Sequence, residues 1–241
     1  MSMLEGLNGN GFDQEEFNQF VLEHDVIGFF DKPITLKSGR QSHWYVNWRK
    51  PTEDVALTLE LADHIIDFTH HYHLSPDTFY GVPEGATKIA IATQLTWAQE
   101  SPHYKEGSHV LSMGRGKIKE HGKPEDRYFL GVPRGKTIVI EDVTTTGGSL
   151  IDTTSQLLEA NVNVIAAYGL TNRMERRDDG LGVEEALAKI HIPYLALSNA
   201  IDVLPRAYQH YKPDQRIVDA VEQEFRQYGV KPLTLNPKLE V

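Results

Sequence analysis

The sequence predicts an α/β fold, in which helices flank a parallel central sheet and an N-terminal segment forms a cap. Short apolar runs alternate with amphipathic helical segments over residues 76–200, the order that the crossover connections of a parallel sheet require. The apolar runs are nearly continuous, which is typical of strands covered on both faces. With 241 residues, 40% of them hydrophobic, the chain is long enough to bury a sizeable core.

The first part of the chain, residues 1–75, is expected to form the cap and its helices. After a Gly- and Asn-rich start, hydrophobic residues at helical spacing predict helices over residues 13–24 and 53–72. Between them, "FFDKPITLKSGRQSHWYVNWRK", residues 29–50, mixes Gly, Pro and aromatic residues, which predicts short strands and turns.

The sheet is expected within residues 76–200, followed by a C-terminal helical extension over residues 201–241. The sequence contains no internal repeat and no low-complexity linker, so residues 1–241 are expected to form a single domain. The expected strands are 78–82, 109–113, 137–141, 163–170 and 193–197, and the expected helices are 86–97, 150–158, 182–190 and 213–228.

Composition narrows the function classes. The chain has no cysteine, which excludes disulfides, thiolate zinc sites and cysteine nucleophiles and favours a cytoplasmic location. Its net charge is −10, whereas proteins that bind nucleic acid usually carry a basic surface. No apolar run approaches the ~18 residues of a membrane span, and the N-terminus does not resemble a signal peptide. We therefore expect neither a nucleic-acid nor a membrane partner.

Polar residues gather where one expected strand ends, in "IVIEDVTTTGGSLID", residues 138–152. In an open parallel sheet, ligands bind at the carboxyl ends of the strands. Hydroxyls and the free amides of a helix N-terminus suit a phosphate, and Ser149 is expected to cap that helix. Carboxylates suit sugar hydroxyls or a hydrated cation. A phosphorylated sugar matches both halves, and the alternative is a capped turn with solvent-facing acids. The candidate binding residues are Glu141, Asp142, Thr144, Thr145, Thr146, Gly147, Gly148 and Ser149.

The stretch "VIEDVTTTGGS", residues 139–149, resembles the phosphoribosyl-pyrophosphate motif of the type I phosphoribosyltransferases. The resemblance implies the fold of that family. It also implies that Glu141 and Asp142 hold the ribose 2′- and 3′-hydroxyls of the donor, phosphoribosyl pyrophosphate (PRPP), while residues 144–149 hold its 5′-phosphate. The motif fixes the donor substrate and leaves the acceptor open.

A second stretch, "ITLKSGRQSHWYVN", residues 34–47, resembles the N-terminal segment of orotate phosphoribosyltransferases. The resemblance implies that Lys37 lies near the pyrophosphate and orotate, and that Trp44 and Tyr45 lie beside the base pocket. It also implies that Thr145 contacts orotate. Without the resemblance, the segment predicts an edge strand with a turn.

A third stretch, "GRGKIKEHG", residues 114–122, resembles the flexible basic segment of that family, which reaches into the neighbouring subunit's site and covers the pyrophosphate. This implies a homodimer. Gly116 departs from the family pattern at a basic position, and a solvated surface turn is the alternative. The resemblance implies Arg115 and Lys117 as PRPP-binding residues and Lys37, Lys119, His121 and Asp142 as catalytic residues.

Two further stretches match less closely. In "GLTNRMERR", Arg173 matches the residue that binds the orotate carboxylate in the family, but Asn172 replaces the usual Asp. Arg176 and Arg177 are expected at the surface, with the alternative that either takes the place of Arg173. In "GVPEGATKIA", Gly85 replaces a Lys that many members have.

Together, the resemblances imply an enzyme that transfers the phosphoribosyl group of PRPP to orotate, giving orotidine 5′-monophosphate and pyrophosphate. They imply Mg²⁺ as the cofactor, held mainly by substrate and water, with no protein metal ligands. Two alternatives stay open. The departures at Gly85, Gly116 and Asn172 would suit a non-catalytic PRPP-binding regulator, and a transferase of the same fold could act on another base.

Overall fold

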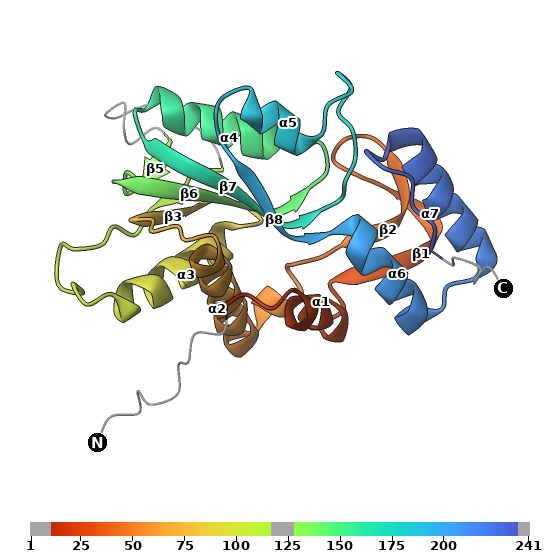
Figure 1. Cartoon of the computed structure of the whole chain (residues 1–241), viewed down its shortest axis with the longest axis horizontal. Helices are drawn as coiled ribbons and strands as arrows, with labels where there is room; N and C mark the ends of the chain where they lie inside the picture. The colour runs from red at the N-terminus through yellow and green to blue at the C-terminus, as the bar shows by residue number, and fades with distance from the viewer. Residues whose placement is uncertain (1–10, 117–127, 236–241) are drawn as a thin grey trace.

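The structure, a computed structural model, describes residues 11–116 and 128–235. Its centre is a parallel sheet of β3 (Thr78–Gly81), β6 (Lys136–Thr144), β7 (Asn163–Asn172) and β8 (Tyr194–Asn199), paired in that order. One face is covered by α4 (Gly148–Glu159) and α5 (Val183–Ala188), and the other by α2 (Val55–His71) and α3 (Thr87–Glu100) (Figure 1). The predicted parallel sheet flanked by helices is confirmed.

The register of the sheet brings two strand ends together. Residues 138–140 of β6 are fully buried, because helices cover both faces of the sheet. Glu141 of β6 lies opposite Gly169 of β7. At the ends of these strands, the amide of Arg173 donates to the carbonyl of Thr144 at 2.9 Å. The acidic end of β6 therefore lies beside the segment that carries Arg173.

An antiparallel hairpin of β1 (Ile27–Thr35) and β2 (Gln41–Val46) forms the predicted short strands and turn. The hairpin packs against α7 (Gln215–Tyr228), at the end of the molecule away from α3 (Figure 1). A 3₁₀ helix over Pro51–Glu53 leads from the hairpin toward α2. The hairpin thus lies between the central sheet and α7 (Figure 1).

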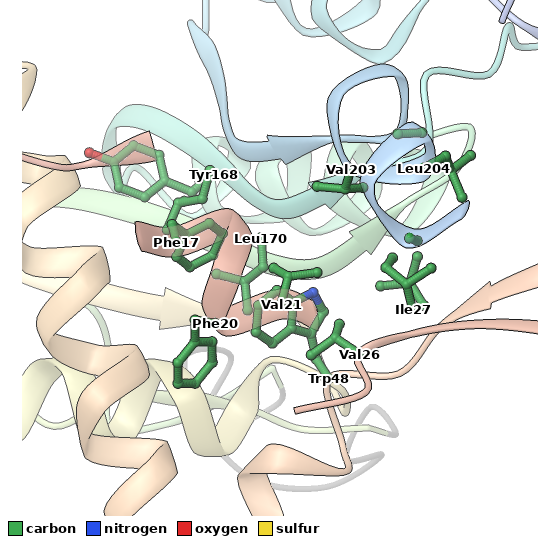
Figure 2. Close-up of a cluster of buried hydrophobic side chains, with 14 of the residues drawn as sticks. Phe17, Phe20, Val21, Val26, Ile27, Trp48, Tyr168, Leu170, Val203 and Leu204 are labelled. Atoms are coloured by element: carbon green, nitrogen blue, oxygen red, sulfur yellow. The ribbon is translucent and has the colours of Figure 1, made fainter. Parts of the chain in front are cut away.

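The N-terminal helix, the sheet and the C-terminal helices share one hydrophobic cluster (Figure 2). Phe17 and Phe20, from α1 (Gln14–Glu23), stack on Trp48 with ring centroids 5.8 and 6.3 Å away. Leu170 of β7 and Val203 of α6 (Ala200–Tyr211) belong to the same cluster. This shared core is compatible with the expectation that residues 1–241 form a single domain, and that expectation stays a prediction. No helix in the two described ranges is long and apolar enough to cross a membrane.

Two predictions of secondary structure differ from the structure. The stretch 109–113 does not form a strand of the central sheet; only Met113–Gly114 (β4) is extended, paired antiparallel with Phe129–Leu130 (β5). One reason is that the Gln94 side chain donates to the Val110 carbonyl at 2.9 Å and so takes the place of a neighbouring strand. The C-terminal extension contains α6 as well as the predicted helix, which is α7.

Candidate active site

A cavity of 310 Å³ lies where β6 passes into α4, and we call it the loop cavity. The chain turns there at Gly147, whose φ of +68° places it in the left-handed region. A Cβ at Gly147 would lie 2.3 Å from Cγ2 of Val183, so only glycine fits. The first amides of α4 have no partner within the helix and make its N-terminus an anion site. The lining residues are Lys37, Ser38, Glu141, Val143, Thr145, Thr146, Gly147, Gly148, Ser149 and Asp152.

Side chains from distant segments support this loop. Lys37, in the hairpin turn, donates from Nζ to Oγ of Ser149 at 2.7 Å. The N-cap of α4 is Gly147, without a side-chain hydrogen bond, so the prediction that Ser149 caps this helix is wrong. Arg177 donates from Nη1 to the Thr146 carbonyl at 2.7 Å. Arg177 therefore stabilises the loop, whereas the sequence predicted only a surface position for it.

The two acids at the end of β6 are withdrawn from water. Glu141 is 7% exposed, and its Oε2 has no hydrogen-bond partner among the described residues. Burial, and secondarily the charge of Asp142, raise the pKa of Glu141 to about 8, while Lys37 acts in the opposite direction. Burial also raises the pKa of Asp142, against backbone hydrogen bonds and the charges of Arg49 and Lys37. A buried acceptor without a partner costs free energy, which a ligand hydroxyl would recover.

A second cavity of 240 Å³, which we call the hairpin cavity, lies between β2 and the ends of β6 and β7. It contains five of the predicted site residues, and Lys37 is common to it and the loop cavity. The fold thus brings the predicted donor-binding and acceptor-binding segments together. The predicted residues that line it are Lys37, Tyr45, Asp142, Thr145 and Arg173, and the others are Thr35, Leu36, Val46, Asn47, Trp48, Arg49 and Val143.

A third cavity of 330 Å³ contains Arg115, and we call it the Arg115 cavity. Lys37 and Ser149 also line it, so Lys37 lies where all three cavities meet. The predicted site residues Lys117, Lys119 and His121 lie outside the described residues. A larger cavity of 630 Å³ lies between the hairpin turn and α7, around Arg40 and Tyr228.

Of the predicted site residues that the structure describes, two do not line these cavities. Trp44 is fully buried and stacks on Phe225 of α7 with ring centroids 6.1 Å apart, so it does not line the hairpin cavity itself. Its expected place beside the base pocket stays a prediction. Its neighbour Tyr45 is 36% exposed and does line the hairpin cavity. The hydroxyl of Thr144 is hydrogen-bonded to that of Tyr194 within the sheet, so the structure does not support Thr144 as a side-chain phosphate ligand.

Arg49 is a cation that no motif indicated. It lines the hairpin cavity, and its guanidinium forms no ion pair with any residue in the described ranges. Its charge helps to keep Asp142 ionised. By contrast, no three His, Cys, Asp or Glu side chains within residues 11–116 and 128–235 gather as a possible metal-binding group.

Comparison with known proteins identifies the family. No protein-family model matches the chain. The orotate phosphoribosyltransferase of Lachnoclostridium phytofermentans is 28% identical over 232 residues, which cover 90% of this chain and 98% of that protein. The orotate phosphoribosyltransferase of Rhodopseudomonas palustris is 34% identical over 180 residues, which cover 71% of this chain and 87% of that protein. This chain belongs to the orotate phosphoribosyltransferase family.

Solved structures of orotate phosphoribosyltransferases share the fold. That of Francisella tularensis superposes with a TM-score of 0.63 at 21% identity, over 89% of this chain and 99% of the other. That of Mycobacterium tuberculosis in complex with 5-phospho-α-D-ribosyl 1-diphosphate, which is PRPP, has a TM-score of 0.52 at 18% identity, over 79% and 98%. At these identities the likeness concerns the fold.

The structure gives a reason for one departure from the orotate phosphoribosyltransferase pattern. Gly85 lies directly against Asp142, and a Cβ there would be 2.3 Å from Oδ2 of the carboxylate. A side chain at position 85 would therefore displace Asp142 or the loop itself. Gly116, the second departure, lies beside Glu84, with its Cβ position 2.7 Å from the Glu84 Oε1.

We expect Gly85→Ala to lower kcat/KM at least tenfold, because the added methyl group would push Asp142 out of place, and tenfold corresponds to about 1.4 kcal/mol of transition-state stabilisation. Steady-state kinetics with PRPP as the varied substrate provides the measurement. Gly11→Ala is the matched control, since its Cβ would meet only His71 at 3.6 Å. Equal kcat/KM values for Gly85→Ala and the wild type would show that Asp142 does not need the space that the missing side chain of Gly85 leaves.

We expect Glu141→Gln to stabilise the free protein at high pH. The folded pKa of Glu141, about 8, lies above its ordinary value of 4.5. The contribution of Glu141 to the stability of the wild type is therefore fully present below pH 4.5, and it is lost as the pH rises through 8. At pH 9 the free energy of unfolding of the variant should exceed that of the wild type by about 2–4 kcal/mol. At pH 4.5 the two free energies of unfolding should be nearly equal.

Urea unfolding at both pH values measures this difference. The control is Glu106→Gln, a change of the same chemistry at an exposed loop position. A Glu141→Gln variant whose stability tracks the wild type across the pH range would mean that Glu141 is not a strained, buried carboxyl group.

Proposed function

We propose that this chain transfers the phosphoribosyl group of PRPP to orotate, giving orotidine 5′-monophosphate and pyrophosphate, as a pentosyltransferase. The observation that carries the proposal is the buried, unpartnered Oε2 of Glu141, next to Asp142 and beside a helix N-terminus that suits a phosphate. Membership of the orotate phosphoribosyltransferase family supports the choice of both substrates.

The loop cavity suits the ribose 5-phosphate part of the donor. Amides at the start of α4 and the hydroxyls of Thr145 and Thr146 would bind the 5′-phosphate. Glu141 and Asp142 would accept hydrogen bonds from the ribose hydroxyls. A sugar supplies such hydroxyls without a negative charge of its own, so it can satisfy these buried acids at lower cost than a phosphate could.

The hairpin cavity suits the acceptor, because orotate is a planar anion. Tyr45 offers aromatic surface there, and Lys37, Arg49 and Arg173 offer positive charge. Both cavities meet at Lys37. A base in the hairpin cavity would therefore lie next to a ribose in the loop cavity, as the transfer requires.

The reaction needs orientation and charge stabilisation more than a nucleophile. The bond between the anomeric carbon and a pyrophosphate oxygen breaks, a bond from that carbon to a ring nitrogen of orotate forms, and the proton of that nitrogen passes to pyrophosphate or solvent. Holding both substrates in line supplies a large share of the rate enhancement. Lys37 and Arg115, which line the Arg115 cavity, would stabilise the negative charge that develops on pyrophosphate. Lys117, Lys119 and His121 are proposed to act with them.

Mg²⁺ fits the donor set of this site. Two carboxylates and several hydroxyls provide hard oxygen ligands near the cavities, and Mg²⁺ usually keeps several waters and uses substrate phosphates. We propose that pyrophosphate oxygens and water hold the ion, which would add positive charge against the leaving group.

We also propose that each subunit is a single domain, that two subunits form a homodimer, and that the protein is cytoplasmic. The dimer follows from the family resemblance of residues 114–122, whose basic residues would complete the partner's site. The lack of cysteine supports a reducing compartment.

We expect the purified chain to release pyrophosphate from PRPP with orotate and not with uracil, hypoxanthine or adenine. Asp142→Asn should lower kcat/KM with orotate about tenfold or more, since a hydrogen bond to a charged group contributes ~1.5–3 kcal/mol. A continuous pyrophosphate-release assay measures both.

Each other outcome selects an alternative. Turnover with a purine alone would remove orotate as the acceptor. Tight PRPP binding without turnover on any base would favour the regulator suggested by Gly85, Gly116 and Asn172. An unchanged rate for Asp142→Asn would remove that carboxylate from the site.

We expect activity to return when two inactive variants form mixed dimers. If the basic segment acts across the interface, a Lys119→Ala subunit and an Asp142→Asn subunit together rebuild one complete site. Random 1:1 mixing should give roughly a quarter of wild-type activity. Refolding or co-expression, followed by the same assay, tests this. Activity no higher than the sum of the separate variants would show that each subunit uses its own segment.

A further inference from the structure

The guanidinium of Arg173 is held on three sides, and one of the three groups, Glu224, lies outside the sequence motifs. It lies over the ring of Trp44, with Cζ 3.7 Å from the ring centroid. Nε donates to Oε1 of Glu175 at 2.7 Å, and Nη2 donates to Oε1 of Glu224 at 2.9 Å. The side chain of Arg173 is 1% exposed, and those of Glu175 and Glu224 are 2% and 7% exposed.

Glu224 comes from α7, in the C-terminal extension, 51 residues after Arg173. Ser42 of the hairpin completes the arrangement, because its hydroxyl accepts from Nη2 of Arg173 at 3.0 Å and lies 2.9 Å from both oxygens of Glu224. Arg40, whose side chain is 12% exposed, donates to the other oxygen of Glu175 at 2.9 Å, so two arginines face two buried glutamates. The charges of this group therefore balance.

These contacts leave one edge of the guanidinium for a ligand. Of its five N–H groups, the one on Nε and both on Nη2 have close acceptors. Nη1 makes a single long contact of 3.4 Å to the Trp44 carbonyl, so one of its two N–H groups has no acceptor in the described parts of the chain. Arg173 belongs to the wall of the hairpin cavity.

We propose that Glu224 is a positioning residue of the acceptor site. Glu224 accepts from Nη2 and Glu175 accepts from Nε, and together they fix the orientation of the Arg173 guanidinium. The Nη1 edge is then free to donate to the carboxylate or a ring oxygen of orotate. The inference rests on the proposed function, and it gives the C-terminal helix a part in substrate recognition.

The physical reason is preorganisation. A long side chain that is free to rotate loses entropy when it binds a ligand, whereas one that is already held does not. Arg173 cannot turn without breaking two charged hydrogen bonds and its stacking on Trp44. Glu224→Gln keeps the shape of the side chain and an oxygen acceptor but removes the charge that anchors Nη2.

The test compares KM values in Glu224→Gln with those of the wild type. We expect KM for orotate to rise about tenfold and KM for PRPP to stay within about twofold, because only acceptor binding depends on Arg173. Glu222→Gln is the matched control on the same helix: Glu222 accepts from the Leu235 amide and does not contact Arg173. Thermal unfolding of each variant separates a loss of folding from a loss of positioning.

If Glu224→Gln does not fold, Ser42→Ala provides the same test with a smaller change, and KM for orotate should then rise about threefold. Equal increases in both KM values, or an unchanged KM for orotate in a folded variant, would overturn the role of Glu224. Failure of the wild type to use orotate would remove the proposed function as well, so the two results are told apart by the wild-type assay.

Discussion

Glu141 and Asp142 follow one another at the end of β6, and burial raises the pKa of both. Burial and the charge of its neighbour disfavour the ionised form of Glu141, and its Oε2 has no hydrogen-bond partner among the described residues. Lys37 and Arg49 lie close enough to offset part of this cost, because their positive charges favour the ionised carboxylates. This local cost in free energy is the feature around which the rest of the site is arranged.

The site depends on two elements outside the sheet. The hairpin carries Lys37 to the point where three cavities meet, and it is itself packed against α7 through Trp44 and Phe225. The buried group of Arg173, Glu175 and Glu224 joins the end of β7 to that same helix. Buried ion pairs add little net stability when desolvation is counted, but breaking one is costly. Their value here is to fix the hairpin and the sheet relative to each other.

Local sequence indicated much of this arrangement. A run of apolar residues followed by acids, threonines and glycines predicts a strand end with a binding loop, and these features depend only on neighbours in the chain. The hairpin segment was likewise recognisable, and Lys37 and Tyr45 line the hairpin cavity. The strand expected at 109–113 does not form in the central sheet, and the Gln94 side chain bonds the backbone there, a contact that periodicity does not encode.

The remaining differences and omissions arise from contacts between distant segments. Trp44 and Tyr45 alternate across a strand, and only the position of α7 decides that Trp44 enters the core. Thr144 belongs to the motif by sequence, yet Tyr194, on another strand, occupies its hydroxyl. Arg49 and Glu224 carry no local signal, because their importance comes from the cavity and the guanidinium that the fold brings to them.

A crystal structure of the chain with bound PRPP tests the central claim most directly. The account predicts that the ribose 2′- and 3′-hydroxyls lie within about 3 Å of carboxylate oxygens of Glu141 and Asp142, with the 5′-phosphate on the amides that follow Gly147. A donor bound elsewhere, or a ribose whose hydroxyls leave the buried Oε2 of Glu141 without a partner, would contradict it.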